Sequence, residues 1–371
     1  MTFAILYSTQ PLLPVFSKEF RVSPTIASFS LSFTTGALAV FMLVAGTLSE
    51  ALGRKRVMGV TLFAASVLAV LTSFSQNFTT LLGFRIGQGV FLAGLPAIAM
   101  AYLSEEVDPK SVGLAMGLYI SGNSVGGMSG RILTGFLTDW FSWRVAMGTI
   151  GVLSIFSSVL FVWLLPPSAQ FRPSPLKFRQ LSHSFVQHLQ NPSLLRLYGV
   201  GFVLMGSFVT LYNYISYPLL AAPYHLSQSV VGLLFVVYLA GTFSSAWMGR
   251  LADERGRRLV LEYAIAIMLA GAVLTLVSPL WLKLLGIAVF TFGFFGGHSI
   301  ASGWVGREAK SERAQASSLY LFFYYVGSSV GGSRGGLLYS HFEWPGVIGM
   351  IVVLLGIGVW LAARQREVRS S

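Results

Sequence analysis

The chain has 371 residues, of which 54% are hydrophobic and only 10% are charged, and its mean hydropathy is +0.71. Soluble domains carry about 25% charged residues, so this composition excludes an ordinary water-soluble protein and predicts a membrane protein. No cysteine is present, which excludes disulfides, thiolate catalysis and thiolate-bound metals.

Apolar runs long enough to cross a bilayer recur along the whole chain. We predict an all-α membrane protein with twelve transmembrane helices in residues 2–17, 25–49, 57–75, 79–102, 112–138, 144–165, 195–217, 228–248, 259–278, 281–304, 314–339 and 345–363. The first of these is short, because about 16 residues before Lys18 reach only about 24 Å. We therefore expect missing residues upstream of Met1 or a misassigned start.

The net charge of +12 is placed unevenly along these predicted helices. One set of alternate loops, with the C-terminal tail, holds 18 Lys and Arg, whereas the opposite set holds four. Basic loops remain in the cytoplasm, so we predict a multi-pass membrane protein with both termini in the cytoplasm. The basic excess is then an orientation signal and does not indicate nucleic-acid binding.

A basic loop motif occurs once in each half of the chain. Gly46–Arg56 reads G-T-L-S-E-A-L-G-R-K-R, and Gly249–Arg258 reads G-R-L-A-D-E-R-G-R-R, 203 residues later (249 − 46). Ser124–Gly127 likewise recurs as Ser329–Gly332, at an offset of 205. The repeat predicts two pseudo-symmetric six-helix halves.

The predicted halves are residues 1–165 and residues 193–371, the second with a short basic tail. Residues 166–192 between them contain five prolines and form a predicted cytoplasmic linker. A short interfacial amphipathic helix around Leu181, Phe185 and Leu189 is the alternative for part of it.

Within the loop motif, glycines allow two helices to meet in a tight turn, and an acid can pair with the following arginine. The predicted cytoplasmic gate comprises Gly46, Glu50, Gly53, Arg54, Gly249, Asp253, Gly256 and Arg257. The alternative is that these charges serve orientation alone.

Charged and titratable groups inside predicted helices are few. Arg85 precedes Gln88 in the fourth helix, and a cation in hydrocarbon costs about 2.5–3.5 kcal/mol on insertion scales, so it should face the interior. No Asp or Glu is predicted near the middle of a helix, so His298 is the best titratable candidate for proton coupling, with Arg85 and Gln88. The alternative for His298 is a structural hydrogen bond.

Helices 5 and 11 combine glycines with arginines. Arg131 and Arg334 are intramembrane cations that either attract an anionic substrate or bond carbonyls exposed by the glycines. The predicted helix-packing glycines are Gly122, Gly126, Gly127, Gly130, Gly327, Gly331 and Gly332.

Aromatic side chains with polar tips gather in helices 1, 7 and 11, and such rings suit an amphipathic ligand. The predicted substrate cavity comprises Tyr7, Gln10, Tyr212, Asn213, Tyr214, Tyr320 and Tyr324.

These motifs resemble the major facilitator superfamily over essentially the whole chain. Gly249–Arg258 fits the family's loop pattern G-x-L-A-D-x-x-G-R-[RK], whereas the first copy departs from it at Glu50. Arg85-x-x-Gln88-Gly89 is similar to a signature of proton-coupled members. The glycines of helix 5 resemble the drug/proton antiporter pattern, with Gly127 in place of Pro and Arg131 in place of Gly. The overall character is that of bacterial inner-membrane exporters grouped with drug- and arabinose-efflux permeases, so the resemblance implies a protein of the inner membrane.

The resemblance implies a secondary transporter that works by alternating access, with loop networks that latch its inner face. We expect proton-coupled efflux of a small amphipathic or anionic solute by a monomer in the lipid bilayer, without cofactor or metal. A facilitator or importer of a sugar or organic acid is the first alternative. A membrane-embedded enzyme is the second, but the catalytic cluster that it needs is not visible, and no Walker motif for ATP-driven transport is present.

Overall fold

The computed structural model describes residues 1–108, 111–168, 178–309 and 311–365, and every regular element in these ranges is a helix. The central part of the predicted linker, 169–177, and the end of the basic tail, 366–371, lie outside the described residues. Contacts divide the chain into two compact units.

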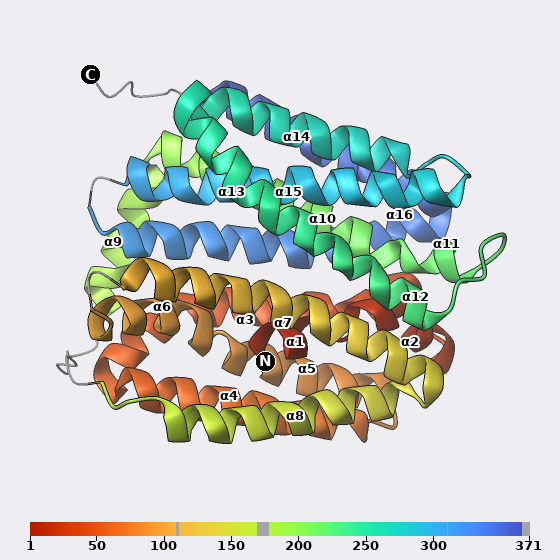
Figure 1. The fold of residues 1–371 in the computed structure, drawn as a ribbon, viewed down its shortest axis with the longest axis horizontal. Helices are drawn as coiled ribbons and strands as arrows, with labels where there is room; N and C mark the ends of the chain where they lie inside the picture. The colour runs from red at the N-terminus through yellow and green to blue at the C-terminus, as the bar shows by residue number, and fades with distance from the viewer. Residues whose placement is uncertain (109–110, 169–177, 310, 366–371) are drawn as a thin grey trace. The chain divides into compact units, whose positions relative to one another are not determined.

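Unit 1 comprises Met1–Val22, Ile26–Lys177 and Leu226–Phe235. Its helices are α1 (Thr2–Tyr7), the 3-10 turn η1 (Gln10–Leu12), α2 (Leu13–Glu19), α3 (Pro24–Leu52), α4 (Arg54–Ser73), α5 (Phe78–Leu92), α6 (Gly94–Glu106), α7 (Val112–Trp140), α8 (Trp143–Leu164) and α12 (Gln228–Leu233). Helices α4 and α8 run side by side (Figure 1), and α7 packs against α1.

Unit 2 comprises Ser23–Thr25, Phe178–His225 and Val236–Ser371. Its helices are α9 (Phe178–Gln190), α10 (Pro192–Tyr214), α11 (Ser216–Leu220), α13 (Tyr238–Arg255), α14 (Arg257–Leu274), α15 (Leu280–Glu308) and α16 (Arg313–Ala363); the turn η2 (Leu234–Val237) spans the boundary. Helices α10 and α16 form one extensive contact, and α14 and α15 form another (Figure 1).

Eight helices within the described residues are long and apolar enough to cross a membrane. One of them, α16, covers two predicted transmembrane segments. It is kinked at Glu343 (φ 52°, ψ −145°), two residues before Pro345, a residue that interrupts regular helix. The twelve-helix count and the boundaries of the two halves remain predictions.

One segment of unit 1 comes from far along the sequence. Helix α12 packs against α7, where Gly135 faces Gly232 across a backbone contact too close for a Cβ atom. Beside it, Asp139 Oδ2 accepts bonds from the Ser229 hydroxyl (2.7 Å) and the Ser229 backbone N–H (3.3 Å). An anion at the first turn of a helix is stabilising, so Asp139 secures α12 to α7.

In unit 2, glycines bring α14 and α15 into backbone contact. A Cβ atom at Gly271 would lie 2.3 Å from the backbone nitrogen of Phe290 and 2.7 Å from the carbonyl oxygen of Gly286. Without a hydrophobic drive inside a bilayer, such close packing of small residues is what holds helices together.

We therefore expect Gly271→Ala to destabilise the protein by about 1–3 kcal/mol, because the new methyl group overlaps backbone atoms that have little room to move. The control is Gly303→Ala on α15, where a Cβ meets no described atom within 4 Å. Thermal unfolding in detergent measures both. Equal melting temperatures for the two variants would contradict this packing.

Candidate functional site

The first helix of unit 1 is interrupted soon after it begins. Helix α1 ends at Tyr7, and the chain continues through the 3-10 turn η1, which contains Pro11. Pro has no N–H and cannot supply the helical bond to the carbonyl four residues earlier, that of Tyr7. The last carbonyls of α1 therefore need other donors, and in a bilayer water is not there to supply them.

Arg85 of α5 donates to two of these carbonyls, and the Ser8 hydroxyl also donates to one of them, that of Ile5 (2.9 Å). Arg85 Nη1 donates to the Ile5 carbonyl (3.0 Å), its Nη2 donates to the Leu6 carbonyl (2.6 Å), and its Nε donates to the Ser30 carbonyl of α3 (2.7 Å). The side chain is fully buried. No carboxylate among the described residues forms an ion pair with it, so backbone dipoles offset the cost of burying this charge.

Gln88 completes this network. Its Oε1 accepts a bond from Arg85 Nη1 (2.5 Å), and its Nε2 donates to Thr72 Oγ1 of α4 (2.8 Å). At Gly89, a Cβ atom would lie 2.2 Å from the Thr34 carbonyl, so only glycine lets α5 approach α3 this closely. Residues Arg85, Gln88 and Gly89 thus join α5 to α1, α3 and α4.

A second buried cation lies on α7. Arg131 Nε donates to Gln10 Oε1 (2.7 Å), and its Nη1 donates to the Gly127 carbonyl (2.8 Å). Its guanidinium carbon lies 4.1 Å from the Tyr7 ring centroid and 4.8 Å from that of Phe235, within the range of cation–π attraction. The predicted residues Tyr7, Gln10 and Arg131 therefore form one cluster. The bond from Arg131 to the Gly127 carbonyl agrees with the alternative interpretation, in which the arginine binds a backbone carbonyl.

In unit 2, His298 of α15 lies among aromatic rings. Its Nδ1 is 2.9 Å from the Tyr320 hydroxyl, and its ring centroid lies 4.6 Å from that of Tyr324 and 6.0 Å from that of Phe294. His298 and Tyr324 are half-buried, whereas Tyr320 is 1% exposed. His298 is thus half-buried, with one ring nitrogen beside a hydroxyl group.

The three consecutive residues predicted for the cavity on helix 7 point in different directions. The Tyr212 hydroxyl lies 2.7 Å from Thr291 Oγ1 of α15, whereas the Tyr214 hydroxyl donates to the Gly332 carbonyl of α16. Successive helical residues are about 100° apart, so these side chains, with Asn213 between them, do not share one face. All three are fully buried.

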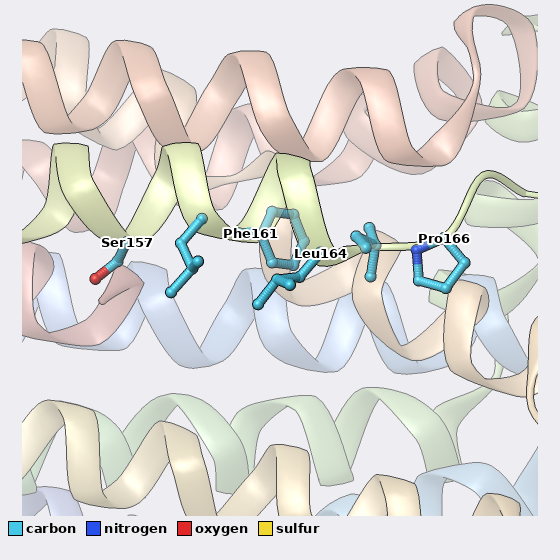
Figure 2. Close-up of a pocket in the computed structure, with 6 residues that line it drawn as sticks. Ser157, Phe161, Leu164 and Pro166 are labelled. Carbon is cyan, nitrogen blue, oxygen red and sulfur yellow. The ribbon is translucent and has the colours of Figure 1, made fainter.

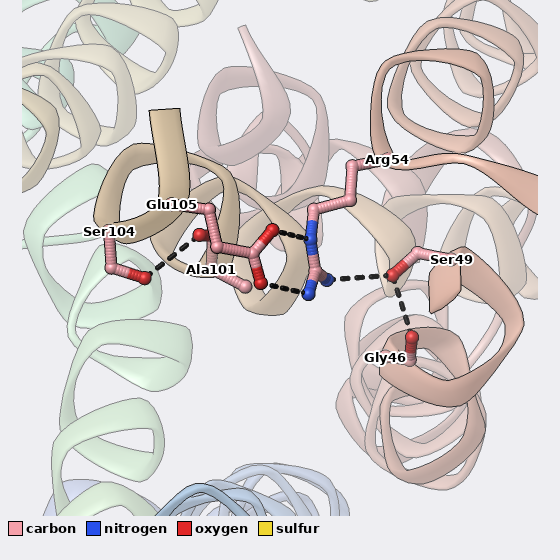
Figure 3. Close-up of polar contacts among 6 residues, drawn as sticks. All are labelled: Gly46, Ser49, Arg54, Ala101, Ser104 and Glu105. Atoms are coloured by element: carbon pink, nitrogen blue, oxygen red, sulfur yellow. Dashed lines mark hydrogen bonds and ion pairs between the residues drawn. The ribbon is translucent and has the colours of Figure 1, made fainter. Parts of the chain in front are cut away.

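The first loop motif forms a compact polar network (Figure 3). Arg54 Nε donates to Glu105 Oε2 of α6 (2.5 Å), and a second bond joins Arg54 Nη2 to Glu105 Oε1, while Nη1 reaches Ser49 Oγ (3.2 Å). The Ser49 hydroxyl donates in turn to the Gly46 carbonyl (2.6 Å). The bidentate geometry suits arginine and carboxylate and makes a directional link between α4 and α6.

The second loop motif has the same turn and a different ion pair. Gly53 and Gly256 both adopt positive φ, 96° and 95°, which non-glycine residues rarely adopt. Asp253 accepts from Arg257 (2.7 Å) and lies 3.3 Å from Arg307 of α15. The side chains of Asp253, Arg257 and Arg307 are more exposed than that of Arg54. Each ion pair of the second network is therefore weaker than the pair of Arg54 with Glu105.

Comparison with known proteins identifies the family. The profile of the Major Facilitator Superfamily matches residues 1–217 and 197–371, so the two matches together cover the whole chain. The chain belongs to the major facilitator superfamily. It is therefore a membrane transporter and not an enzyme.

Relatives in this superfamily are similar over nearly their full length. An uncharacterized MFS-type transporter of Bacillus subtilis, YybF, is 54% identical over 97% of this chain and 89% of its own length. The inner membrane transport protein YnfM of Escherichia coli is 46% identical over 98% of this chain and 87% of its own. The second similarity favours a multi-pass protein of the inner membrane.

Solved structures of superfamily members share the fold. A bacterial homologue of the human lysosomal transporter Spinster has a TM-score of 0.75 at 16% identity, covering 98% of this chain and 93% of its own. A mutant form of the nucleoside transporter NupG has a TM-score of 0.75 at 15% identity, covering 98% of this chain and 96% of its own. At these identities the similarity concerns the fold alone.

Three predicted residues of this superfamily transporter lie differently from their expected positions. Glu50 is exposed and forms no ion pair with Arg54, because Arg54 points to Glu105 on α6. Gly122 has no described atom within 4 Å of a Cβ, in contrast to Gly130, which lies 2.6 Å from Ala4 Cα. Gly122 is therefore not a packing contact among the described residues.

The third is Arg334, which is exposed on α16, whereas Arg131 is buried. The two arginines are therefore not equivalent. This agrees with the repeat offset, which places them two residues out of register. Of the other predicted glycines, Gly327 and Gly331 approach the carbonyls of Phe202 and Gly206 on α10 at 2.1 and 2.6 Å, measured from a Cβ.

The residues that bind the loop motifs from another helix were not among those predicted. Glu105 and Arg307 lie at the ends of α6 and α15, outside both motifs, and Thr72 lies on α4 opposite Gln88. One sequence signal could have found Glu105 and Arg307. Both lie in predicted loops, directly after the predicted helices 4 and 10, which correspond to each other in the repeat.

Arg54 and Glu105 should therefore be energetically coupled. In a double-mutant cycle of Arg54→Gln and Glu105→Gln, we expect a coupling of about 0.5–3 kcal/mol, because each single variant breaks the same bidentate pair. Melting temperatures in detergent give this coupling. The control cycle uses Glu50→Gln with Arg54→Gln and should be additive; coupling to Glu50 with none to Glu105 would refute the assignment.

Proposed function

We propose that this transporter is a twelve-helix antiporter that exports a small amphipathic or anionic solute in exchange for protons. It works by alternating access of two six-helix halves, with both termini in the cytoplasm. The observation that carries the proposal is the fully buried Arg85, which is bonded at once to the interrupted α1, to α3 and to Gln88. A charge in this position holds three helices in register through bonds that depend on the local backbone conformation.

The interrupted helix supports a substrate site near α1. Discontinuous helices in transporters expose backbone groups and are typical of binding regions. Gln10, in the 3-10 turn, accepts from Arg131, and Tyr7 stacks on the same guanidinium. A cation between two aromatic rings, close to an amide, suits a solute with both an apolar body and a negative group.

His298 supplies the titratable group of the proposal. An imidazole changes charge near neutral pH in water, and here its Nδ1 is beside the Tyr320 hydroxyl while the residue is only half-buried. Protonation would oblige Nδ1 to donate to Tyr320, so the ring and its two tyrosine neighbours would change their hydrogen bonding together.

The loop networks provide the proposed cytoplasmic gate. Gly53 and Gly256 make matching turns, and each motif reaches a helix outside itself through an ion pair, Arg54 with Glu105 and Asp253 with Arg307. Such pairs have two states, made and broken, which is what a latch requires.

A facilitator or importer of a sugar or organic acid is the second candidate. It is favoured by the fact that, in the described part of the chain, Arg85 contacts carbonyl and amide oxygens and no carboxylate. A carboxylate inside the membrane is the usual proton carrier, so its absence beside Arg85 removes one route for coupling.

Everted membrane vesicles distinguish the two candidates. With an imposed pH gradient and a panel of anionic, neutral and cationic amphipathic solutes, an antiporter dissipates the gradient when its substrate is added. We expect a substrate-dependent pH change that is absent in vesicles without the protein. Substrate accumulation or exchange with no pH response would replace the antiporter with the facilitator.

His298→Gln should separate coupling from transport. Glutamine keeps a polar group near Tyr320 but does not titrate, so we expect substrate movement to persist while the pH response falls by about tenfold or more. The measurement is the ratio of protons to substrate in the same vesicles. A wild-type ratio in this variant would exclude His298 as the proton carrier.

Arg131→Gln should weaken transport of anionic solutes more than that of uncharged ones. Hydrogen bonds to a charged group contribute about 1.5–3 kcal/mol, so we expect the apparent affinity for an anion to fall about tenfold or more. Arg334→Gln is the matched control, because Arg334 is exposed. Equal losses for anionic and neutral solutes would show that Arg131 has only a structural role.

A further inference from the structure

Unit 1 contains a large groove on the surface between α4 and α8. Its volume is about 1150 Å³. The walls are apolar and well exposed: Val60 and Phe63 come from α4, and Val159, Val162 and Trp163 come from α8, with Trp163 79% exposed. In a membrane protein, a lateral groove with such walls contacts acyl chains, and a tryptophan at its edge is typical of the membrane–water interface.

One end of this groove is strongly basic. The first turn of α4 carries Arg54, Lys55 and Arg56, all of which line the groove. Arg54 points inward to Glu105, and Lys55 Nζ donates to the Leu165 carbonyl at the end of α8 (2.5 Å). Arg56 is exposed and forms no ion pair with any described carboxylate.

The backbone at the same place adds to the positive potential. Helix α4 starts at Arg54 without a side-chain cap and without an acidic residue in its first turn. The N-terminus of a helix favours an anion, so three cations in this turn oppose the helix dipole. An external anion would relieve this opposition and pair with Arg56.

The second loop motif shows the alternative solution within the same chain. There Arg257 pairs with Asp253, and Arg258 pairs with Glu262 at 3.0 Å. The repeat offset of 203 aligns Arg258 with Lys55 and Glu262 with Gly59, so the first copy has no acid one turn after its basic residues. Gly59 lines the groove, where a Cβ atom would lie 2.6 Å from Val162 Cγ2.

A neighbouring groove provides a comparison. About 330 Å³ in volume, it is lined by Ser157, Leu160, Phe161, Leu164, Leu165 and Pro166 (Figure 2). It lies against the same end of α8 but has no basic residue, so it can accept an acyl chain and offers nothing to a charged headgroup.

We propose that the groove between α4 and α8 is a binding site for an anionic phospholipid. The phosphate lies at Arg56, beside the N-terminus of α4, and an acyl chain follows Val60, Phe63 and Trp163. Charge complementarity selects the headgroup, and the apolar walls select a lipid over a free anion. The site adjoins Arg54, so the bound lipid lies beside the first loop network.

Quenching of Trp163 fluorescence tests the proposal in the full-length protein. The protein is reconstituted into phosphatidylcholine vesicles that contain increasing fractions of either brominated phosphatidylglycerol or brominated phosphatidylcholine. The Trp163 signal is the difference between the wild-type protein and Trp163→Phe, which removes the contribution of the other tryptophans. We expect phosphatidylglycerol to be preferred at Trp163 by about fivefold, the effect of one basic residue near an anionic lipid.

Three variants make the result specific. Arg56→Gln should reduce the preference to about one. Arg56→Lys keeps the charge and should retain it, and Arg258→Gln, in the paired second motif, should leave it unchanged. Equal quenching by both lipids in the wild type, or a preference that survives Arg56→Gln, would overturn the proposal. Absence of quenching by either lipid would also overturn it, since the groove would then be covered by protein, such as a second copy of the chain.

Discussion

The interrupted end of α1 is the constraint around which α1, α3, α4 and α5 of unit 1 are joined. A helix that stops in hydrocarbon leaves carbonyl oxygens that have lost their donors, and unpaired polar groups there cost several kcal/mol each. Arg85 helps to meet this need with a planar group that donates to the Ile5 and Leu6 carbonyls, beside the Ser8 hydroxyl on Ile5, and it also donates to the Ser30 carbonyl of α3. The carbonyl groups at the interrupted end of α1 offset the cost of burying the Arg85 charge. The Arg85 guanidinium in turn offsets the cost of leaving those carbonyl groups without helical donors. Without Arg85 these carbonyl groups would lose its hydrogen bonds, and without the interruption in α1 the buried Arg85 would lose these acceptors.

The two copies of the loop motif keep the same turn but differ in their chemistry. In the first, the loop motif contributes the cation, Arg54, and the neighbouring helix contributes the acid; in the second, the motif contributes the acid, Asp253, and the neighbour contributes Arg307. Deeper in the bilayer, the offset of 205 places Phe290 where Arg85 would lie (290 − 85). Phe290 is fully buried and stacks near Phe208, with ring centroids 6.2 Å apart. The two copies of the repeat therefore share geometry and differ in where they place charge.

The sequence predicted those features that depend on local pattern. Membrane class follows from composition, the turn glycines follow from the repeated motif, and burial of Arg85 follows from its place inside an apolar segment. The partners of Arg85 could not be predicted, because they are backbone carbonyls that become available only once α1 has broken. Glu105 could not be predicted as the partner of Arg54 for a related reason: it lies 51 residues from Arg54, and only helix packing brings the two side chains together.

Helical phase explains another part of the difference between sequence and structure. Tyr212 and Tyr214 are close in sequence and both carry hydroxyl groups, so both were predicted to line the substrate cavity. Their positions around α10 instead direct Tyr212 to α15 and Tyr214 to α16. Gly122 shows the converse. A motif position can be occupied by glycine without any helix approaching it, because close packing depends on the surface opposite.

The contact of α12 with α7 bears on how the protein is made. Unit 1 is not finished when its contiguous residues have left the ribosome, since it also needs Leu226–Phe235. At about 5–20 residues per second, the interval between Lys177 and Leu226 lasts roughly 2–10 s. During that time the glycine surface of α7 around Gly135 lacks its partner, and Asp139 lacks Ser229. The contacts of unit 1 are therefore complete only after Leu226–Phe235 have been translated.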